Sequence, residues 1–145
     1  MIDDLGVEVP MVGSVQRVVS LVPSITEAIA MTCPTVLVGC TDYCIRPANL
    51  EQVVGHKVAR VRGTKNPDRP AIIGLRPDLV VANQEENREH DVTMLREAGV
   101  PVWVTCIDTV PEAISSLTRL FKEGFDGGKP QWLHDAGEKW NEPWP

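Results

Sequence analysis

Four short apolar runs divide the chain and predict four strands. The runs occupy residues 17–22, 36–39, 79–82 and 102–105. Continuous apolar runs of this length are typical of strands that are covered on both faces of a sheet. Polar residues follow each run, so we expect each strand to end at the surface. Residues 45–60 are less regular, and no strand or helix is predicted there.

Apolar residues at helical spacing predict helices after the first, third and fourth strands. Ser24 and Glu27 have the spacing of a capping box, which marks a helix start, and this helix closes near 33–34. Thr109 and Glu112 form a second capping box. In the first helix we expect Ile25, Ala28 and Ile29 to be buried. In the next, the buried residues are expected to be Val92, Leu95 and Ala98, and Gly99 is expected to be the C-cap. The buried face of the last helix is expected to be Ala113, Ile114, Leu117, Leu120 and Phe121, and the helix is expected to break at Gly124, Gly127 and Gly128.

The stretch 60–87 combines a short helix, a strand and a polar cluster. Asn66 is a favourable N-cap, Pro67 suits the first helical position, and Asp68 meets the positive end of the helix dipole. The strand then opens onto the polar cluster 83–87, and ligands of open α/β sheets gather at such strand ends. The buried side of the short helix is expected to be Ile72, Ile73 and Leu75, with Pro77 as its stop.

The alternation of strands and helices predicts an α/β fold, a Rossmann-like, mostly parallel sheet of about four strands flanked by helices. With 145 residues the chain fits one domain that can bury a core. Residues 1–16 form a polar lead-in, 17–110 form the lobe, and 127–145 form a tail that holds three of the four tryptophans. Such an aromatic tail either packs back on the sheet or expects a partner.

Composition and charge exclude several classes of function. The net charge of −6 argues against nucleic-acid binding, because no basic patch meets the phosphates. No apolar run is long enough to insert in a membrane, and the acidic start lacks the pattern of a signal peptide. The chain is therefore interpreted as cytoplasmic as written, or as missing its true start. The sequence has neither a Gly-x-Gly-x-x-Gly motif nor a phosphate loop.

The chemistry-bearing residues do not form a catalytic or metal-binding pattern. Cys40 and Cys44 lack the spacing of a zinc or redox motif, and a disulfide would be unusual in the cytoplasm. Cys40 and Cys106 lie at predicted strand ends and are expected to be small buried thiols. The three histidines are scattered and expected at the surface, and no nucleophile–base pair is visible. We therefore predict a protein that is not an enzyme and has no cofactor or metal ligand set.

Several segments together resemble the N-terminal lobe of class III (helical-backbone) substrate-binding proteins of ABC importers, in particular the cobalamin-binding-like, helical backbone metal receptor branch. The segments that carry the resemblance are 17–27, 38–44, 62–68, 75–83, 85–87 and 102–105. The family has two lobes joined by a long helix, with the ligand held between them. The resemblance implies that 111–126 begins this connecting helix and that the second lobe is absent.

The resemblance implies reversible, non-catalytic binding of a metal chelate: a corrinoid, haem or a ferric siderophore. It also implies an ABC permease as a partner, with Asp68 near the carboxylate that docks on the permease, although Asp68 can equally be a helix-start carboxylate. The alternative function is an interaction module, a split or truncated half that needs a second lobe, a second copy or a partner chain. The Trp-rich tail motivates that alternative.

Candidate ligand-binding residues are those that follow the predicted strands. Tyr43 can stack on a flat macrocycle or cover the end of the sheet. Glu85 and Asn87 can bind polar ligand edges or cap the helix that follows. The full candidate set is Pro23, Ser24, Thr41, Tyr43, Asn83, Glu85, Asn87 and Asp108, with Cys106 beside the last.

Overall fold

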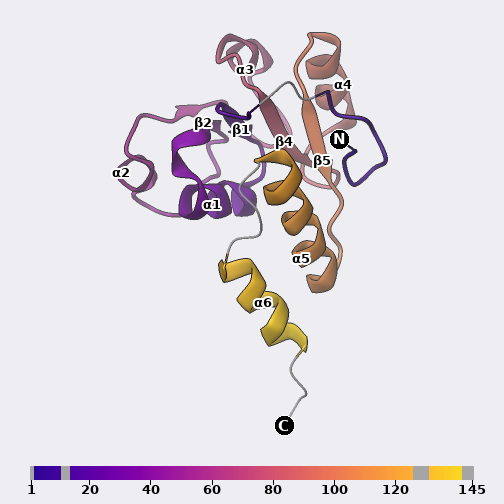
Figure 1. The fold of residues 1–145 in the computed structure, drawn as a ribbon. Coiled ribbons are helices and arrows are strands. Elements are labelled where there is room, and N and C mark those ends of the chain that lie inside the picture. Colours follow the sequence, from indigo (N-terminus) through magenta and orange to yellow (C-terminus); the bar gives the residue numbers. More distant parts are fainter. Residues whose placement is uncertain (1, 11–13, 126–130, 142–145) are drawn as a thin grey trace.

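The computed structural model describes residues 2–10, 14–125 and 131–141, which form a sheet between two layers of helices (Figure 1). The sheet is parallel and has the strand order β3-β2-β1-β4-β5. This arrangement confirms the predicted α/β class. The strands are β1 (Val18–Ser20), β2 (Leu37–Cys40), β3 (Ala59–Arg60), β4 (Leu79–Asn83) and β5 (Val102–Thr105).

The fifth strand, β3, lies in the segment where no element was predicted. It has two residues, Ala59 and Arg60, which pair with Gly39 and Cys40 of β2. A two-residue edge strand has no apolar run, so its sequence carries no periodic signal. Helix α2 (Leu50–Val54), in the same segment, is also too short to show helical periodicity.

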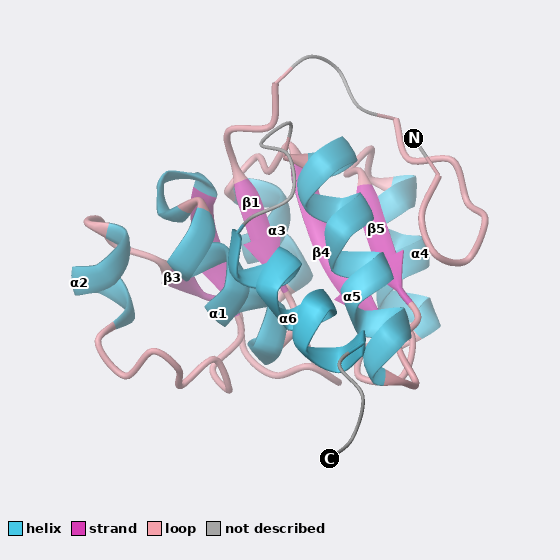
Figure 2. Cartoon of the chain, turned by 60° about the horizontal axis from the view of Figure 1, so that its bottom comes forward, coloured by secondary structure: helices cyan, strands magenta, loops and turns pink. Residues whose placement is uncertain are grey.

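The longer helices cover both faces of the sheet. Figure 2 shows α1 (Pro23–Thr32), α5 (Val110–Arg119) and α6 (Gln131–Asn141) in front of the sheet. Helices α3 (Arg69–Gly74) and α4 (Glu89–Glu97) cover its other face. A 3-10 turn, Pro34–Val36, precedes β2, and a π-helical turn, Leu120–Gly124, follows α5. Gly124 thus ends this helical segment, as expected, whereas Gly127 and Gly128 lie outside the described residues.

Two apolar layers explain why the strands are continuous apolar runs. Successive side chains of a strand point to opposite faces. In β4, Leu79 and Val81 join the layer beneath α1, α5 and α6, whereas Val80 and Ala82 join the layer beneath α3 and α4. Because both faces are covered, the first four positions of β4 are apolar, and the polar Asn83 stands at its end.

The first predicted capping box is wrong, and the second is confirmed. Helix α1 starts at Pro23, and no side chain caps it, because its N-cap residue is Val22, which has no side-chain acceptor. Ser24 and Glu27 are exposed instead. At α5, the hydroxyl of Thr109 accepts a hydrogen bond from the backbone N–H of Glu112 at 3.2 Å.

Helix α3 begins later than predicted. Its N-cap is Asp68, whose Oδ1 accepts a hydrogen bond from Ala71 N at 3.1 Å, so the prediction of Asn66 as N-cap is wrong. The proline of its first turn is Pro70, and Pro67 instead pairs with Arg62 in an isolated bridge. The chain bends between these two residues and reaches the helix only after the bridge.

The expected buried faces are only partly confirmed. Ile72 is fully buried, but Ile73 is 41% exposed, because α3 turns that side to solvent. In α4, Val92 and Leu95 are buried, Ala98 is exposed, and Gly99 follows the C-cap Ala98 with a φ of 85°. Along α5 and the turn after it, Leu120 and Phe121 are buried, whereas Ala113, Ile114 and Leu117 are half-buried.

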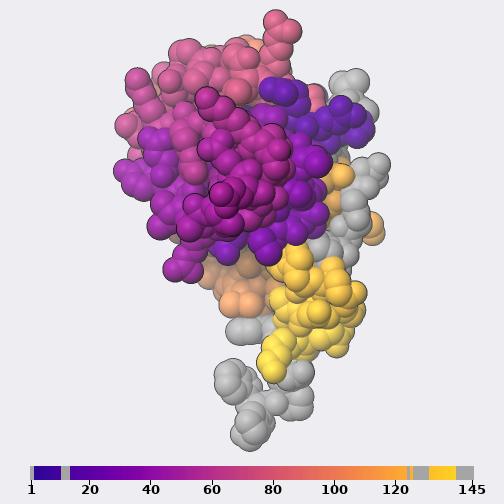
Figure 3. All heavy atoms as spheres, turned by 90° about the vertical axis from the view of Figure 1, so that its left-hand side faces the viewer, coloured from indigo at the N-terminus to yellow at the C-terminus, as the bar shows by residue number. Residues whose placement is uncertain are grey.

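Helix α6 packs back on the lobe, which is one of the two outcomes expected for the tail. Trp132 donates from Nε1 to the hydroxyl of Thr32 at 2.7 Å and lies edge-on to Phe121, with ring centroids 6.1 Å apart. Leu133 is 1% exposed. Figure 3 shows α6 against the surface of the first part of the chain. The side chain of Trp140 and all of Trp144 lie outside the described part. No helix among the described residues is both long and apolar enough to cross a membrane.

The lead-in is more ordered than its sequence suggested. Residues 2–9 turn back on themselves, with an antiparallel bridge between Ile2 and Glu8. Asp4 N donates to Val104 O at 3.2 Å, so this segment runs along the outer edge of β5 (Figure 1). An edge strand exposes unpaired backbone groups, and the N-terminal segment, residues 2–9, covers part of that edge.

Candidate functional site

The carboxyl ends of the parallel strands gather five loops at one edge of the sheet. From β1 the chain proceeds to β2 and β3 on one side, and it returns to β4 and β5 on the other. The carboxyl ends of β1 and β4 are therefore neighbours whose continuing chains leave in opposite directions, and ligands of open α/β sheets bind at such a point. Pro23 and Ser24 follow β1, and Asn83 ends β4.

Asn87 joins the loops around this point. Its Oδ1 accepts a hydrogen bond from Asn83 N at 2.8 Å, and its Nδ2 donates to Leu21 O at 3.2 Å and to Thr64 O at 3.1 Å. The side chain is buried, with 4% exposure. Asn87 does not cap α4, whose N-cap is Arg88. The capping alternative is therefore wrong, and the amide instead ties β1, β4 and the loop after β3 together.

A second set of hydrogen bonds connects the loops joined by Asn87 to β5. The side-chain nitrogen of Asn83 donates to the hydroxyl of Thr105 at 3.0 Å, and Asn83 Oδ1 accepts from Glu85 N at 3.0 Å. The ammonium of Lys65 donates to the backbone oxygen of Glu85. The side chain of Glu85 itself is exposed. The backbone of this loop is thus fixed, and its carboxylate faces water.

Tyr43 lies on the loop after β2 and is 65% exposed. A Cβ atom added at Gly63 would lie 3.1 Å from Cε2 of Tyr43 and 2.3 Å from Oδ1 of Asn66. The aromatic ring therefore lies beside the Gly63 backbone, and only a glycine leaves room for this contact. Much of the ring nevertheless faces solvent, so Tyr43 both covers a loop and presents a flat apolar surface.

Thr41 is buried and holds the turn that carries Tyr43. Its hydroxyl lies 3.2 Å from Sγ of Cys44, and the thiol also contacts the hydroxyl of Thr26 at 3.1 Å. The guanidinium of Arg60 donates to the carbonyls of Thr41 and Cys44, at 2.9 Å each. The sequence offered no sign of Arg60, because its partners are backbone atoms that only the β2–β3 pairing brings near.

The remaining candidates are separate from this cluster. Pro23 is half-buried, whereas Ser24 and Asp108 are exposed. Cys106 is half-buried rather than buried, and its thiol donates to Oε1 of Gln84 at 3.1 Å. The structure therefore unites Thr41, Tyr43, Asn83, Glu85 and Asn87 through shared loops, and it leaves Asp108 at the far end of the edge, after β5.

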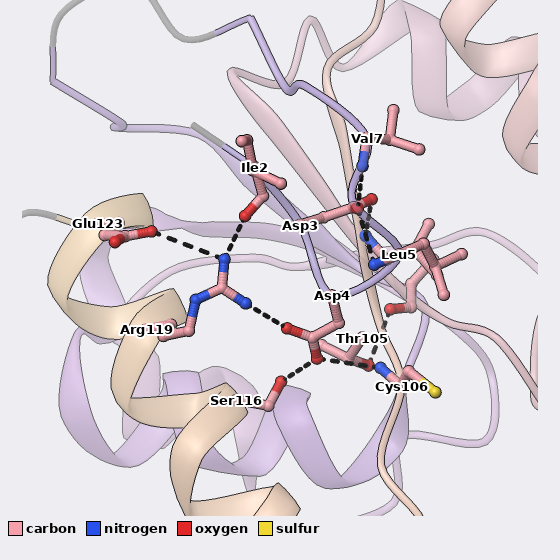
Figure 4. A network of polar contacts seen from close by, with 12 residues as sticks. Ile2, Asp3, Asp4, Leu5, Val7, Thr105, Cys106, Ser116, Arg119 and Glu123 are labelled. Carbon is pink, nitrogen blue, oxygen red and sulfur yellow. Dashed lines mark hydrogen bonds and ion pairs between the residues drawn. The ribbon is translucent and has the colours of Figure 1, made fainter.

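Two carboxylates of the N-terminal segment, Asp3 and Asp4, tie it to β5 and α5 (Figure 4). Asp3 is 2% exposed and accepts hydrogen bonds from the backbone of Leu5, Val7 and Val104 at 3.0 to 3.1 Å, and from the guanidinium of Arg96 at 3.0 Å. Asp4 accepts from Cys106 N at 3.0 Å, from the Ser116 hydroxyl, and from Arg119 at 2.7 Å.

Neither carboxylate was among the predicted site residues, although the spacing of Asp3 and Gly6 indicates a turn. Aspartate followed closely by glycine favours a turn in which the carboxylate accepts backbone N–H groups. Gly6 has a φ of 79°, in the left-handed region that glycine adopts at little cost.

A hollow of about 290 Å³ lies between the N-terminal segment, α4 and the ends of β4 and β5. Its volume is at the lower end of pockets that bury a drug-sized ligand. Among the described residues, no group of three or more His, Cys, Asp and Glu side chains could hold a metal ion. The hollow is lined by Leu5, Val7, Asn83, Gln84, Asn87, Glu89, Val92, Thr93, Arg96 and Val104.

Solved structures of known proteins share this architecture. No family model matches the chain. Solved structures with the same fold include a periplasmic vitamin B12-binding protein, BtuF, of Vibrio cholerae, with a TM-score of 0.72 and 23% identity over 87% of this chain. A periplasmic haem-binding protein from Pseudomonas aeruginosa gives a TM-score of 0.71 and 24% identity, also over 87% of this chain. The chain therefore has the fold of about half of each of these two binding proteins.

One curated relative is similar in sequence as well. The vitamin B12-binding protein of Vibrio parahaemolyticus is 29% identical to this chain over 118 residues, which are 81% of the chain and 41% of the relative. The chain likewise covers 48% of the Vibrio cholerae structure and 43% of the Pseudomonas aeruginosa structure. It therefore spans less than half the length of these proteins. Both solved relatives are periplasmic, and the cytoplasmic location inferred from the sequence stays a prediction.

Proposed function

We propose that this chain binds a metal chelate, such as a corrinoid, haem or a ferric siderophore, as the N-terminal lobe of a substrate-binding protein. The observation that carries the proposal is the edge at the ends of β1 and β4, where braced loops present the exposed ring of Tyr43. The relatives named as vitamin B12-binding and haem-binding proteins support this ligand class.

The first step of the mechanism is stacking on a rigid platform. Corrinoids and haem are flat macrocycles, and an aromatic ring that is already held in place contacts such a face without ordering a mobile side chain. One edge of the Tyr43 ring lies near the Gly63 backbone, and Arg60 donates to the carbonyls of the turn on either side of Tyr43. The backbone that carries the ring is thus held by contacts within the lobe.

Polar ligand groups would meet the exposed side chains along the same edge. Ser24, Glu85 and Asp108 are exposed and can accept hydrogen bonds from amide or hydroxyl groups of a chelate. Thr41, Asn83 and Asn87 act differently, because their polar atoms are engaged within the lobe. Their role is to position the loops. The binding is reversible, and no covalent step is involved.

The second wall of the site would come from a second lobe, because this edge presents one surface only. A large chelate held on one side leaves most of its area in water, which limits its affinity. We further propose that an ABC permease docks on the lobe surface near Asp68. Its carboxylate caps α3 through Oδ1 and stays half-buried at the surface.

Spectral titration of the purified chain with cyanocobalamin, haemin and a ferric siderophore tests the proposal. We expect saturable spectral changes with one of these classes, and the same experiment with Tyr43→Ala should show weaker binding. Circular dichroism establishes that each sample is folded. A folded chain that shows no saturable change with any of the three would refute the proposed ligand class.

The alternative, an interaction module, has weaker support because Trp132 and Leu133 pack on the lobe. Size-exclusion chromatography with light scattering distinguishes the two functions. A chain that is monomeric and binds a chelate supports the first function. A stable dimer without chelate binding supports the second.

A further inference from the structure

The hollow of about 290 Å³ between the N-terminal segment, α4 and the ends of β4 and β5 has apolar side chains in its lining. Val92 and Val104 are buried, with 7% and 3% exposure, and belong to the apolar layer beneath α3 and α4. Leu5 and Val7 line the hollow from the N-terminal segment and are 42% and 36% exposed. Apolar side chains that stay this exposed beside a hollow leave apolar surface that a ligand can cover.

Hydrogen bonds of Asp3 fix the backbone that carries Leu5 and Val7. The Oδ1 atom of Asp3 accepts from the N–H groups of both residues at 3.0 Å, and Asp3 N donates to Val7 O at 2.9 Å (Figure 4). Its Oδ2 accepts from Val104 N at 3.1 Å, which ties the same segment to β5. The wall of the hollow is therefore held by contacts within the lobe, and a ligand does not have to order it.

Two charged residues of α4 line the hollow, and their surroundings differ. The guanidinium of Arg96 donates to Asp3 Oδ2 at 3.0 Å and to Val102 O at 2.9 Å, so its charge is paired. Glu89 is exposed in the first turn of α4, and among the described residues its carboxylate has neither an ion-pair nor a hydrogen-bond partner. Thr93, which also lines the hollow, lies one turn after Glu89 on the same side of the helix. The hollow thus combines an apolar wall with an unpaired carboxylate.

We propose that this hollow is a binding site for a small aliphatic amine. The alkyl chain lies against the four apolar side chains, and the ammonium pairs with Glu89 and donates to the hydroxyl of Thr93. An apolar cavity of about 150 Å³ holds benzene, so a hollow of about 290 Å³ has room for an amine of about six to eight carbon atoms. A carboxylate of the same length binds less well, because Glu89 repels it and Arg96 is already paired. The site adjoins the ends of the strands but does not depend on chelate binding.

Titration of the isotopically labelled chain with hexylamine, hexanol and hexanoate at neutral pH, followed by NMR of the backbone amides, provides the test. The three probes share an alkyl chain and differ in the charge of the head group. We expect saturable shifts of the amide signals of Leu5, Val7 and Thr93 with hexylamine, at an affinity about fivefold above that of hexanol, and the weakest binding with hexanoate. In a folded chain, no saturable shift at these amides, or a hexylamine affinity no higher than that of the other probes, would overturn the proposal.

The variants Glu89→Gln and Glu97→Gln provide a matched pair, because Glu97 is an exposed glutamate at the other end of α4 and does not line the hollow. Glu89→Gln should lower the affinity for hexylamine about fivefold and leave that for hexanol unchanged, whereas Glu97→Gln should change neither. If Glu89 serves only the start of the helix, Glu89→Gln lowers the stability of the chain but keeps the ratio of the two affinities, and the proposal is wrong. The titration of the wild-type chain decides even if a variant fails to fold.

Discussion

The N-terminal segment and the turn after β2 both lie at margins of the sheet, but they use their side chains in opposite ways. In the N-terminal segment, the buried carboxylate of Asp3 accepts four hydrogen bonds, three of them from backbone N–H groups. In the turn after β2, Tyr43 and Ile45 direct apolar surface into solvent. One margin is closed by its own polar contacts, whereas the other keeps an apolar face available.

This contrast separates side chains that hold the lobe from those that can meet a ligand. A buried, fully bonded group cannot leave its partners without a large loss of stability. An exposed aromatic ring contributes little to folding and can therefore be used for binding. The same criterion divides the predicted site, because Thr41 and Asn87 are buried, whereas Tyr43 and Glu85 are exposed.

The largest effect is expected at Asp3. In Asp3→Ala the backbone N–H groups of Val7 and Val104 and the charge of Arg96 lose their shared acceptor. Removing one partner of a buried ion pair costs about 3–5 kcal/mol of unfolding free energy. Urea denaturation followed by circular dichroism measures it. Asp108→Ala, which removes an exposed carboxylate, is the control and should change little. Equal effects of the two substitutions would mean that the N-terminal segment does not hold the lobe.

Asn87→Ala should have the next largest effect. The substitution leaves Asn83 N, Leu21 O and Thr64 O without the amide that joins them. Unsatisfied buried groups cost about 1–3 kcal/mol, so the urea midpoint should fall clearly. Glu86→Ala, at the exposed neighbour, is the matched control. If Asn87→Ala is as stable as its control, water replaces the amide, and the hydrogen bonds of Asn87 do not stabilise the lobe.

Asp68→Ala tests the helix cap and should have a smaller effect. Loss of the bond to Ala71 N should lower stability by about 1 kcal/mol, as for other N-caps. Asp68→Asn keeps an N-cap acceptor but removes the charge, so its stability should stay near that of the wild type. Thermal unfolding of both variants provides the comparison. A large loss in Asp68→Asn would show that the charge, rather than the cap, stabilises this site.

Tyr43→Ala should change stability least and binding most. Because the ring is 65% exposed, we expect the unfolding free energy to change by no more than about 0.5 kcal/mol. The affinity for a flat chelate should fall about tenfold, or about 1.4 kcal/mol, because the stacking surface is lost. Tyr43→Phe keeps the ring and should bind nearly as the wild type does. If Tyr43→Ala binds normally, Tyr43 only covers the loop.

Patterns within a single element were predictable from the sequence. The four apolar runs correspond to β1, β2, β4 and β5, because strands covered on both faces are mostly apolar along their length. Thr109 was correctly identified as a cap, because its partner is only three residues away. The parallel sheet followed from the alternation of strands and helices, and with it the edge where the strand ends gather, whereas the order of the strands came from the structure.

Contacts between distant segments were decided by the tertiary structure alone. Asp3 meets Arg96 and Val104, and Asn87 meets Leu21, across separations that no local pattern records. Arg60 finds its acceptors only because a two-residue strand pairs with β2. Local sequence therefore determined the longer strands and helices, because periodicity and capping act over a few residues, but not β3 and α2. Only the packed sheet decided which polar side chains form hydrogen bonds inside the lobe and which are exposed and free to bind a ligand.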